Sequence, residues 1–371
     1  MPKLMCIVPD NYEALDRKGV SSHILQRDLN GYWDRVITVH PFCKRERVIQ
    51  LSDRHVVMEY ERNDIIETVA KLNLLAKKEN VTAVKAHDPY FTGPLALILS
   101  RIRAIPYVVM ICSSYELVRK EYSRAQLRFD WLDGVVGRIT MSRANAVFGG
   151  SEDARLWAIQ NGAKQTALVR TGGIADIHFT TPEGRPRWQG ATKDEIVLFV
   201  GRLDAIKFPE DAILAYKRIR QFHPDSTMVI VGDGPLKEQL VSKYGQPENR
   251  IMFTGFVDPA SLASLMATAN VALVPLGGSA LVELALAEVP IVAYDVDWHK
   301  ELIHDGAGVL VPLRDWVSMA DEASNILADK DRATTMGRTA RQVALAQHSL
   351  EAVQEQERQC FNEVLLRRGE K

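Results

Sequence analysis

The sequence predicts an α/β protein made of two doubly wound domains. Its 371 residues exceed one ordinary hydrophobic core, since about 150 residues per domain is usual. Short apolar runs alternate with amphipathic stretches, which is typical of β-α units on a parallel sheet. A looser segment, Asp176–Asp194, interrupts this alternation with prolines and glycines. We therefore expect domains at 1–178 and 190–350, and a C-terminal helix, 352–371, that is free to pack back on the first domain.

The composition is that of an ordinary globular enzyme. Hydrophobic residues make up 46% of the chain and charged residues 25%. The net charge of -1 provides no global field to recruit nucleic acid. The four cysteines are scattered without a C-x-x-C pair, and no apolar run or N-terminal layout indicates a membrane span or a signal peptide. We expect a reduced, cytoplasmic protein that binds neither zinc nor nucleic acid.

The elements of the first half follow from apolar runs and from helical stripes with capping residues. Asn63 and Ser151 precede two of the expected helices as candidate N-caps. The expected strands are Leu4–Val8, Arg35–Val39, Val81–Ala86, Tyr107–Cys112 and Ala146–Gly149, and the expected helices are Ser21–Asn30, Asn63–Asn80, Thr92–Arg101 and a segment after Ser151.

The second half repeats the same alternation, and its last segment is a helix with one apolar side. The expected strands are Glu195–Val200, Met228–Val231, Ile251–Phe253, Val271–Val274 and Ile291–Tyr294, and the expected helices are Asp211–Gln221, a segment from Leu236, Ser261–Ala269, a segment around Leu281–Leu286, and Leu350–Arg368.

The stretch Val271–Asp295 carries the first chemical signal. It reads VALVPLGGSALVELALAEVPIVAYD, which predicts a strand, a glycine turn, a helix and a second strand. The free N–H groups at such a helix start attract an anion. Glu283 lies about one turn inside, where a carboxylate can accept hydrogen bonds from ribose or sugar hydroxyls. The alternative is a plain connector with an acid that suits the helix dipole.

The stretch VLFVGRLDAIK, Val197–Lys207, carries the second signal. Its strand ends at Gly201, and Arg202 and Lys207 follow at the carboxyl end of that strand. Two cations there are suited to a diphosphate, whose charge grows as its bond to a sugar breaks. The alternative is a pair of solvated surface charges.

Taken together and in this order, the two stretches resemble the family-4 retaining glycosyltransferases of the GT-B fold (glycosyl transferases group 1). The resemblance covers most of Glu195–Pro312, including VGDG at Val231–Gly234 and RIMFTGFVDP from Arg250. VGDG alone is only a turn, because it lacks the third glycine of a dinucleotide fingerprint. The resemblance implies two Rossmann-like domains that face each other across a cleft, with the donor bound by the second and the acceptor by the first.

The resemblance also implies roles for individual residues of a donor site. Cations at the positions of Arg202 and Lys207 bind the nucleotide diphosphate, and the acid at Glu283 holds the ribose. The remaining positions of this site are Gly201 at the strand end, Phe256 and Val257, whose backbone faces the base, and Gly278 and Ser279, which lie against the diphosphate and donor sugar.

The chain departs from the family pattern at several positions. The family's first Glu, eight residues before the one at Glu283, is Pro275 here, and the glycine that ends the following helix is Glu288. Cys112 stands where a strand-end His is frequent. The family's Gly-rich loop of the first domain is reduced to Lys18-Gly19-Val20. The departure at Pro275 bears on donor-sugar handling.

Histidines give weaker signals. His87 follows an expected strand, in VKAHDP, and is a catalytic candidate that can contact donor sugar or acceptor, with Asp88 orienting it. The alternative is a His-Asp turn ahead of Pro89. Asp10 also follows an expected strand, and the choice between a functional and a structural role is equally open for it. His299 and His304 we interpret as structural.

The segment Tyr115–Arg143 mixes basic residues with Leu, Phe and Trp. Such a surface can rest on anionic lipid, which would suit a lipid-linked acceptor and gives a hypothesis of peripheral membrane contact. The alternative, slightly favoured by the interleaved acids, is a partly buried connector.

The predicted function is transfer of a sugar, with retention, from a nucleotide-diphosphate sugar to a hydroxyl of a glycan or glycolipid acceptor. A UDP- or GDP-linked donor is expected, with no other cofactor and no metal, because two cations already face the diphosphate. The alternatives are a sugar-nucleotide epimerase, which needs no acceptor, and a non-catalytic binding or scaffold protein. The base, the sugar, the acceptor and the linkage are not predicted.

Overall fold

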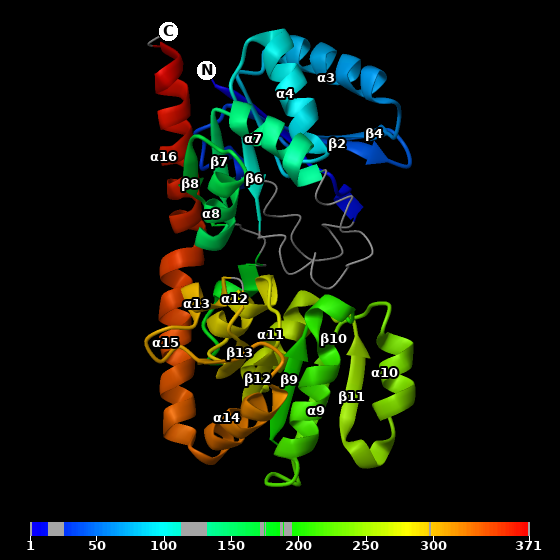
Figure 1. Cartoon of the computed structure of the whole chain (residues 1–371), viewed down its shortest axis with the longest axis vertical. Coiled ribbons are helices and arrows are strands. Elements are labelled where there is room, and N and C mark those ends of the chain that lie inside the picture. Colours follow the sequence, from blue (N-terminus) through cyan, green and yellow to red (C-terminus); the bar gives the residue numbers. More distant parts are fainter. Residues whose placement is uncertain are drawn as a thin grey trace. The chain divides into compact units, whose positions relative to one another are not determined.

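The computed structural model describes residues 2–13, 26–112, 132–170, 174, 176–185, 188, 195–296 and 298–369. The chain forms two compact units, shown in Figure 1. The first comprises Met1–Gly173 and Leu350–Lys371, and the second comprises Ile174–Ser349. Residues 174–178 therefore belong to the second unit rather than to the expected domain 1–178. The physical reason is that Ile174 is buried in the apolar core of the second unit.

The first unit contains an eight-stranded sheet in the order β3-β4-β2-β1-β5-β6-β7-β8. All neighbouring strands are parallel except β3 and β4, which form an antiparallel hairpin at one edge. The strands are β1 (Lys3–Ile7), β2 (Arg35–Cys43), β3 (Arg47–Ser52), β4 (His55–Glu61), β5 (Ala83–Ala86), β6 (Tyr107–Ile111), β7 (Ala146–Gly149) and β8 (Thr166–Leu168).

Helices cover both faces of this sheet, and its central strands β1, β5, β6 and β7 contribute buried apolar residues to the clusters on both sides. Asp64, and not the expected Asn63, caps α3, because the Asp64 side chain accepts from the Glu67 N–H. Ser151 caps α8 as predicted, through the Ala154 N–H. The helical elements are η1 (Gln26–Asp28), α3 (Ile65–Glu79), α4 (Thr92–Arg103), η3 (Leu132–Gly137), α7 (Arg138–Arg143), α8 (Glu152–Gln160) and α16 (Leu350–Gly369).

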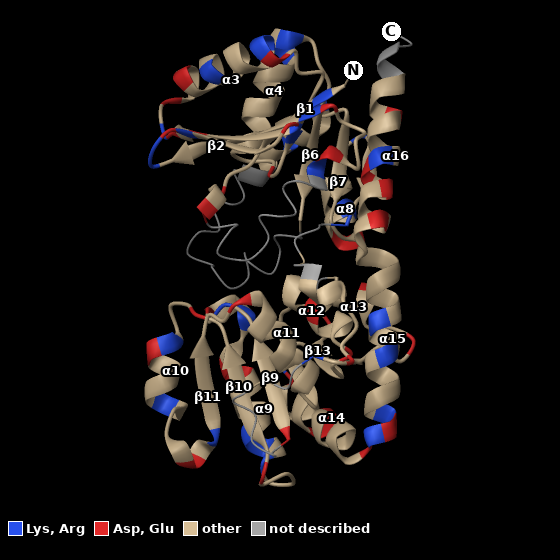
Figure 2. Cartoon of the chain, turned by 180° about the vertical axis from the view of Figure 1, so that it is seen from behind, with Lys and Arg blue, Asp and Glu red and all other residues tan. Residues whose placement is uncertain are grey.

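The second unit contains a six-stranded parallel sheet in the order β11-β10-β9-β12-β13-β14. Its six strands carry no charged residue, and Figure 2 shows the charges on surrounding helices and loops. The strands are β9 (Ile196–Val200), β10 (Thr227–Val231), β11 (Ile251–Gly255), β12 (Val271–Val274), β13 (Ile291–Tyr294) and β14 (Val309–Val311).

Helices join these strands, which makes the second unit a doubly wound α/β domain. Its helical elements are η4 (Asp176–Phe179), η5 (Ala205–Lys207), α9 (Pro209–Ile219), α10 (Lys237–Tyr244), η6 (Pro247–Asn249), α11 (Pro259–Thr268), α12 (Ser279–Leu286), α13 (His299–Leu302), α14 (Trp316–Ala328) and α15 (Lys330–His348).

The last two helices belong to different units. α15 lies against α12 in the second unit, while α16 packs on the first sheet. Phe361 of α16 is fully buried there, edge-on to Trp33 and Phe148 at centroid distances of 5.0 and 5.3 Å. No helix among the described residues is long and apolar enough to cross a membrane.

Candidate functional site

The loops at the carboxyl edge of the second sheet collect most of the predicted donor-site residues. Parallel strands end at the same edge, so the segments after β9, β10, β11 and β12 emerge together. The strand order places β12 directly beside β9, and connections leave these two strands in opposite directions along the sheet. A crevice at such a switch point is the usual ligand position of an open α/β sheet.

Lys207 reaches across this switch point. It ends η5, in the segment after β9, and its Nζ donates to the Gly277 carbonyl oxygen at 3.2 Å. A Cβ built on Gly278 would lie 3.8 Å from the same Nζ. The structure therefore brings the predicted cation and the predicted glycine turn together, although they are 70 residues apart in the chain.

Arg202 is held by an acid that the sequence analysis did not single out. Its guanidinium pairs with Asp204, which is 3% exposed, while 63% of the Arg202 side chain is exposed. The second carboxylate oxygen of Asp204 is buried and has no partner among the described residues. Asp204 therefore orients Arg202 while leaving most of the guanidinium open to a ligand. The pattern R-x-D within VGRLD was the available signal.

The start of α12 lacks a side-chain cap. Gly278 is its N-cap residue, and no acid lies in the first turn. A Cβ on Gly277 would lie 2.7 Å from Leu281 Cβ, so only glycine fits without displacing the helix. Uncapped N–H groups with a nearby ammonium make a positive site suited to an oxyanion.

Glu283 lies in the second turn of α12 and is partly buried. Burial raises the pKa of its carboxyl group to about 7. Within the described chain, no hydrogen bond or ion pair involves this carboxyl group. It is therefore available to hydrogen-bond with a hydroxylated ligand.

Glycines bring the loops after β9, β10 and β11 into close contact. Gly232 has φ +136°, and a Cβ there would lie 2.0 Å from the Gly201 carbonyl oxygen. The Gly232 N–H donates to the Gly255 carbonyl oxygen at 2.9 Å. Beyond Gly255, Phe256 is 81% exposed and Val257 packs partly against the core. An exposed aromatic ring at this edge is available to a planar base.

His87 belongs to the first unit and lies at the corresponding switch point of its sheet, between β1 and β5. Its backbone N–H donates to the Ile7 carbonyl oxygen at 3.1 Å. Burial, followed by the charges of Arg27 and Lys85, lowers the pKa of the imidazole well below its usual value. Nε2 is buried without a partner in the described part of the chain. His87 is therefore a neutral imidazole at this edge.

Asp88 does not orient His87. Its carboxylate accepts from the backbone N–H groups of Tyr90, Phe91 and Thr92, and from the Thr92 hydroxyl at 2.6 Å. Both carboxylate oxygens thus serve the start of α4, so the turn interpretation is correct for Asp88. Asp10 is exposed, and its carbonyl oxygen accepts from His40 Nδ1.

The two histidines singled out in the second unit, His304 and His299, differ in burial. His304 is exposed and lies 3.0 Å from Asp305. His299 is fully buried against the glycine turn. The reduced loop Lys18–Val20 and residues 115–131 of the basic segment lie outside the described residues. No described group of three or more His, Cys, Asp or Glu is arranged to hold a metal ion.

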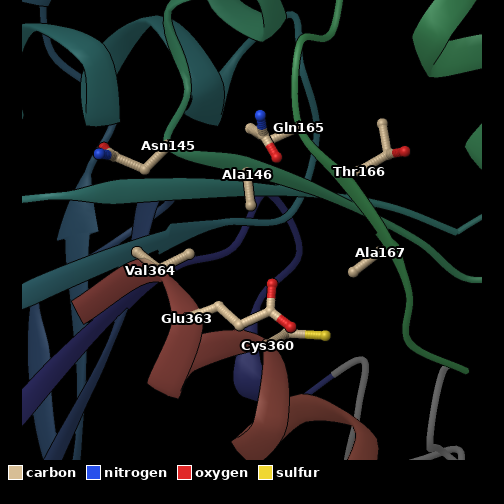
Figure 3. A pocket seen from close by; sticks show the side chains of 8 residues that line it. All are labelled: Asn145, Ala146, Gln165, Thr166, Ala167, Cys360, Glu363 and Val364. Atoms are coloured by element: carbon tan, nitrogen blue, oxygen red, sulfur yellow. The ribbon is translucent and has the colours of Figure 1, made fainter. Parts of the chain in front are cut away.

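A small hollow in the first unit is unrelated to these residues. Figure 3 shows Cys360, Glu363 and Val364 of α16 facing residues of β7 and β8. Burial raises the pKa of the Cys360 thiol to about 11, so it stays protonated and unreactive at neutral pH. None of the predicted site residues lines this hollow.

Comparisons with known proteins point to the same unit. Residues 181–343 match the family model described as Glycosyl transferases group 1, a range that contains every donor-site residue above. The chain is 28% identical over 283 residues to the alpha-D-kanosaminyltransferase of Streptomyces kanamyceticus, covering 72% of this chain and 73% of that protein. It is 32% identical over 200 residues to the phosphatidyl-myo-inositol mannosyltransferase of Mycobacterium leprae, covering 52% and 50%. This chain thus spans about half the length of the mannosyltransferase.

A solved structure shows the same fold across the whole chain. Anabaena Alr3699/HepE in complex with UDP matches with a TM-score of 0.74 at 20% identity, over 98% of this chain and 100% of that chain. The predicted GT-B fold, with two Rossmann-like domains, is confirmed.

Proposed function

We propose that this chain, whose residues 181–343 match the family model of glycosyl transferases group 1, is a glycosyltransferase that moves a sugar from a nucleotide-diphosphate donor to an acceptor hydroxyl with retention. The observation that carries the proposal is the meeting of Lys207 with the glycine turn of α12 at the switch point beside β9. This arrangement places an ammonium, a guanidinium and uncapped helix N–H groups at one sheet edge.

These groups suit the chemistry of a departing diphosphate. As the bond between the anomeric carbon and the phosphate oxygen breaks, negative charge grows on that oxygen, and fixed cations stabilise it. The acceptor oxygen bonds to the anomeric carbon on the same face, and its proton passes to the departing phosphate oxygen. Arg202 and Lys207 are the residues we assign to this stabilisation, and the donor is a substrate rather than a cofactor.

The remaining residues of the edge account for the rest of the donor. Glu283 is positioned to bind ribose hydroxyls, and the backbone of Phe256-Val257 to face the base. The structurally similar Anabaena protein forms complexes with UDP and UDP-glucose, which supports UDP as the first nucleotide to test, with GDP as the alternative.

A glycan or lipid-linked hydroxyl is the proposed acceptor, bound by the first unit near His87. The similar mycobacterial protein is named a phosphatidyl-myo-inositol mannosyltransferase. This name refers to a lipid and so supports a lipid-linked acceptor and peripheral membrane contact. The test of membrane contact is flotation with anionic vesicles, and absence of binding removes it.

A transfer assay tests the proposed function. The protein is incubated with radiolabelled UDP-glucose or GDP-mannose, with and without a glycolipid extract, and both nucleotide release and labelled lipid are measured. Acceptor-dependent labelling with the donor's anomeric configuration supports the proposal. Conversion of the donor without any acceptor identifies an epimerase instead. If the protein binds the nucleotide but turns over no donor, it is a binding protein.

A further inference from the structure

His299 is fully buried behind the glycine turn and joins two backbone segments through its ring. Its Nδ1 lies 2.8 Å from the Tyr294 carbonyl oxygen, and its Nε2 accepts from the Gly277 N–H at 2.9 Å. A carbonyl oxygen only accepts and a backbone N–H only donates, so Nδ1 carries the hydrogen and Nε2 does not. Both hydrogen bonds therefore require a neutral imidazole in one tautomer.

The surroundings keep the ring neutral. Burial, helped by the charge of Lys207, lowers the pKa of His299 to about 4. The hydrogen bond to the Tyr294 carbonyl oxygen and the charge of Asp295 oppose this shift but do not reverse it. Nε2 therefore remains an acceptor for Gly277 at any pH near neutrality.

Gly277 is consequently held at both of its backbone polar groups. His299, after β13, binds its N–H, and Lys207, after β9, binds its carbonyl oxygen at 3.2 Å. A Cβ on Gly277 would lie 3.3 Å from His299 Nε2 and 2.7 Å from Leu281 Cβ, so the residue is also enclosed sterically. Segments after two different strands thus fix the single residue that precedes the N-cap of α12.

We infer that His299 is a positioning residue for the donor diphosphate. By accepting from the Gly277 N–H, it fixes the turn from which α12 starts. It thereby also fixes the Gly277 carbonyl oxygen, which accepts from Lys207 Nζ. His299 itself touches no substrate atom. The inference rests on the proposed function, since it concerns how the donor's phosphates are bound.

Two amide substitutions separate the two hydrogen bonds of the ring. A glutamine amide reaches the position of Nε2 and can accept from Gly277, whereas an asparagine amide reaches only the position of Nδ1 and can bond Tyr294 alone. His299→Gln and His299→Asn are thus matched in chemistry and differ in reach. His299→Met, which fills the space without a strong acceptor, is a second variant in case the asparagine variant does not fold.

Two readouts are measured for each variant that melts cooperatively. The first is the amide hydrogen exchange of peptides covering residues 274–281, which needs no ligand. The second is the affinity for UDP, GDP and inorganic pyrophosphate, with uridine and guanosine as phosphate-free controls. We expect His299→Asn and His299→Met to exchange faster at this turn and to bind the diphosphate about tenfold more weakly, as for loss of one buried hydrogen bond. His299→Gln should stay within about threefold of the wild type, and nucleoside affinity should not change.

The outcomes distinguish failure of the inference about His299 from failure of the proposed function. Equal diphosphate affinity and equal exchange in His299→Asn and the wild type overturn the inference and leave the proposed function standing. Faster exchange with unchanged diphosphate affinity also overturns it, because His299 is then structural only. Failure of the wild type to bind any of the diphosphates overturns the proposed function together with the inference.

Discussion

At the scale of single residues, Glu283 combines a site position with a titration near neutral pH. Its carboxyl group has an ordinary pKa of 4.5, as in the unfolded chain, and burial raises the pKa in the folded chain to about 7. Between these values the folded protein holds the proton more tightly than the unfolded chain does. The associated stability is present in full below pH 4.5 and is lost as the pH rises through 7.

Glu283→Gln should therefore remove part of the pH dependence of folding. Relative to the wild type, the variant is expected to gain about 1–3 kcal/mol of unfolding free energy between pH 5 and pH 8, because glutamine does not ionise. Urea unfolding at both pH values measures this, with Glu238→Gln on the exposed side of α10 as the control. Parallel pH profiles of Glu283→Gln and the wild type would contradict the burial of this acid.

Lys207→Ala should reduce turnover rather than folding. Its ammonium faces the start of α12, where the diphosphate is proposed to bind, and loss of a charge-stabilising group costs about 10²–10³-fold in kcat. Initial-rate measurements with saturating donor check this, and Lys330→Ala, an exposed lysine at the start of α15, is the matched control. Near-wild-type transfer by Lys207→Ala would contradict the assignment of Lys207 to the diphosphate site.

Individual site residues were predictable where a local pattern set their position. Arg202, Lys207 and the Gly278-Ser279 turn follow strands whose apolar runs are clear in the sequence, so their placement at one edge could be expected. The hydrogen bond from the Gly277 N–H to His299 Nε2 spans 22 residues and depends on which strands are neighbours, so it could not be predicted from residue spacing. The hydrogen bonds of Asp88 to the backbone N–H groups at the start of α4 likewise became visible only in the structure.

At the scale of elements, α12 ends in an unfavourable backbone conformation. Glu288, just after the helix, has φ +59°, in the left-handed region that favours glycine. The family pattern places a glycine there, and the structure shows that the glutamate adopts the glycine-like conformation instead of avoiding it.

Glu288→Gly should therefore stabilise the second unit by about 1 kcal/mol, because the left-handed penalty of a side chain is removed. Chemical denaturation measures the change. Glu288→Ala is the control, since it removes the carboxylate, 3.9 Å from Arg341 Nε, but keeps a Cβ in the left-handed region. Equal effects of the two substitutions would assign the change to the carboxylate.

A buried ion pair attaches α16 to the first sheet. Lys85 of β5 and Glu357 of α16 are 6% and 8% exposed, with 2.6 Å between Nζ and Oε1. Glu357→Ala should lower the unfolding free energy by about 3–5 kcal/mol, because it leaves an unpaired buried ammonium. The double variant Lys85→Met/Glu357→Leu should recover most of this loss.

The exposed pair of Arg358 and Glu355 on the same helix is the control for denaturant unfolding. Glu355→Ala should change the unfolding free energy by less than about 1 kcal/mol, although its carboxylate lies 2.7 Å from the guanidinium. A loss of similar size in Glu355→Ala and Glu357→Ala would show that burial of the Lys85 pair contributes little.

Most strands were predicted to within one or two residues, because a parallel sheet buried on both faces consists of short apolar runs. Ala146–Gly149, Val271–Val274 and Ile291–Tyr294 match the observed strands in full. The short strands β8 and β14 were missed, and so was the hairpin of β3 and β4. Burial alternates along β3 (Arg47–Ser52), which is typical of an edge strand, and this weaker pattern does not resemble the apolar runs of the central strands.

At the scale of the whole molecule, the division into two α/β units follows from the repeated alternation, but its boundaries depend on long-range packing. Ile174 joins the second core although it precedes the expected linker. Ser349 alone separates α15 from α16, which belong to different units. No local breaker of the Pro or Gly type marks that change, so the sequence pattern could not locate it.

The most direct test of the central assignment is a thermal-shift panel of UDP, GDP, ADP and TDP on the wild type and on Arg202→Ala/Lys207→Ala. A diphosphate at 100 times its dissociation constant adds about 2.7 kcal/mol of stability to the folded state. We predict that one diphosphate raises the melting temperature of the wild type and that the double variant loses this shift. No shift with any nucleotide, or an equal shift in the double variant, would contradict a donor site at the carboxyl edge of the second sheet.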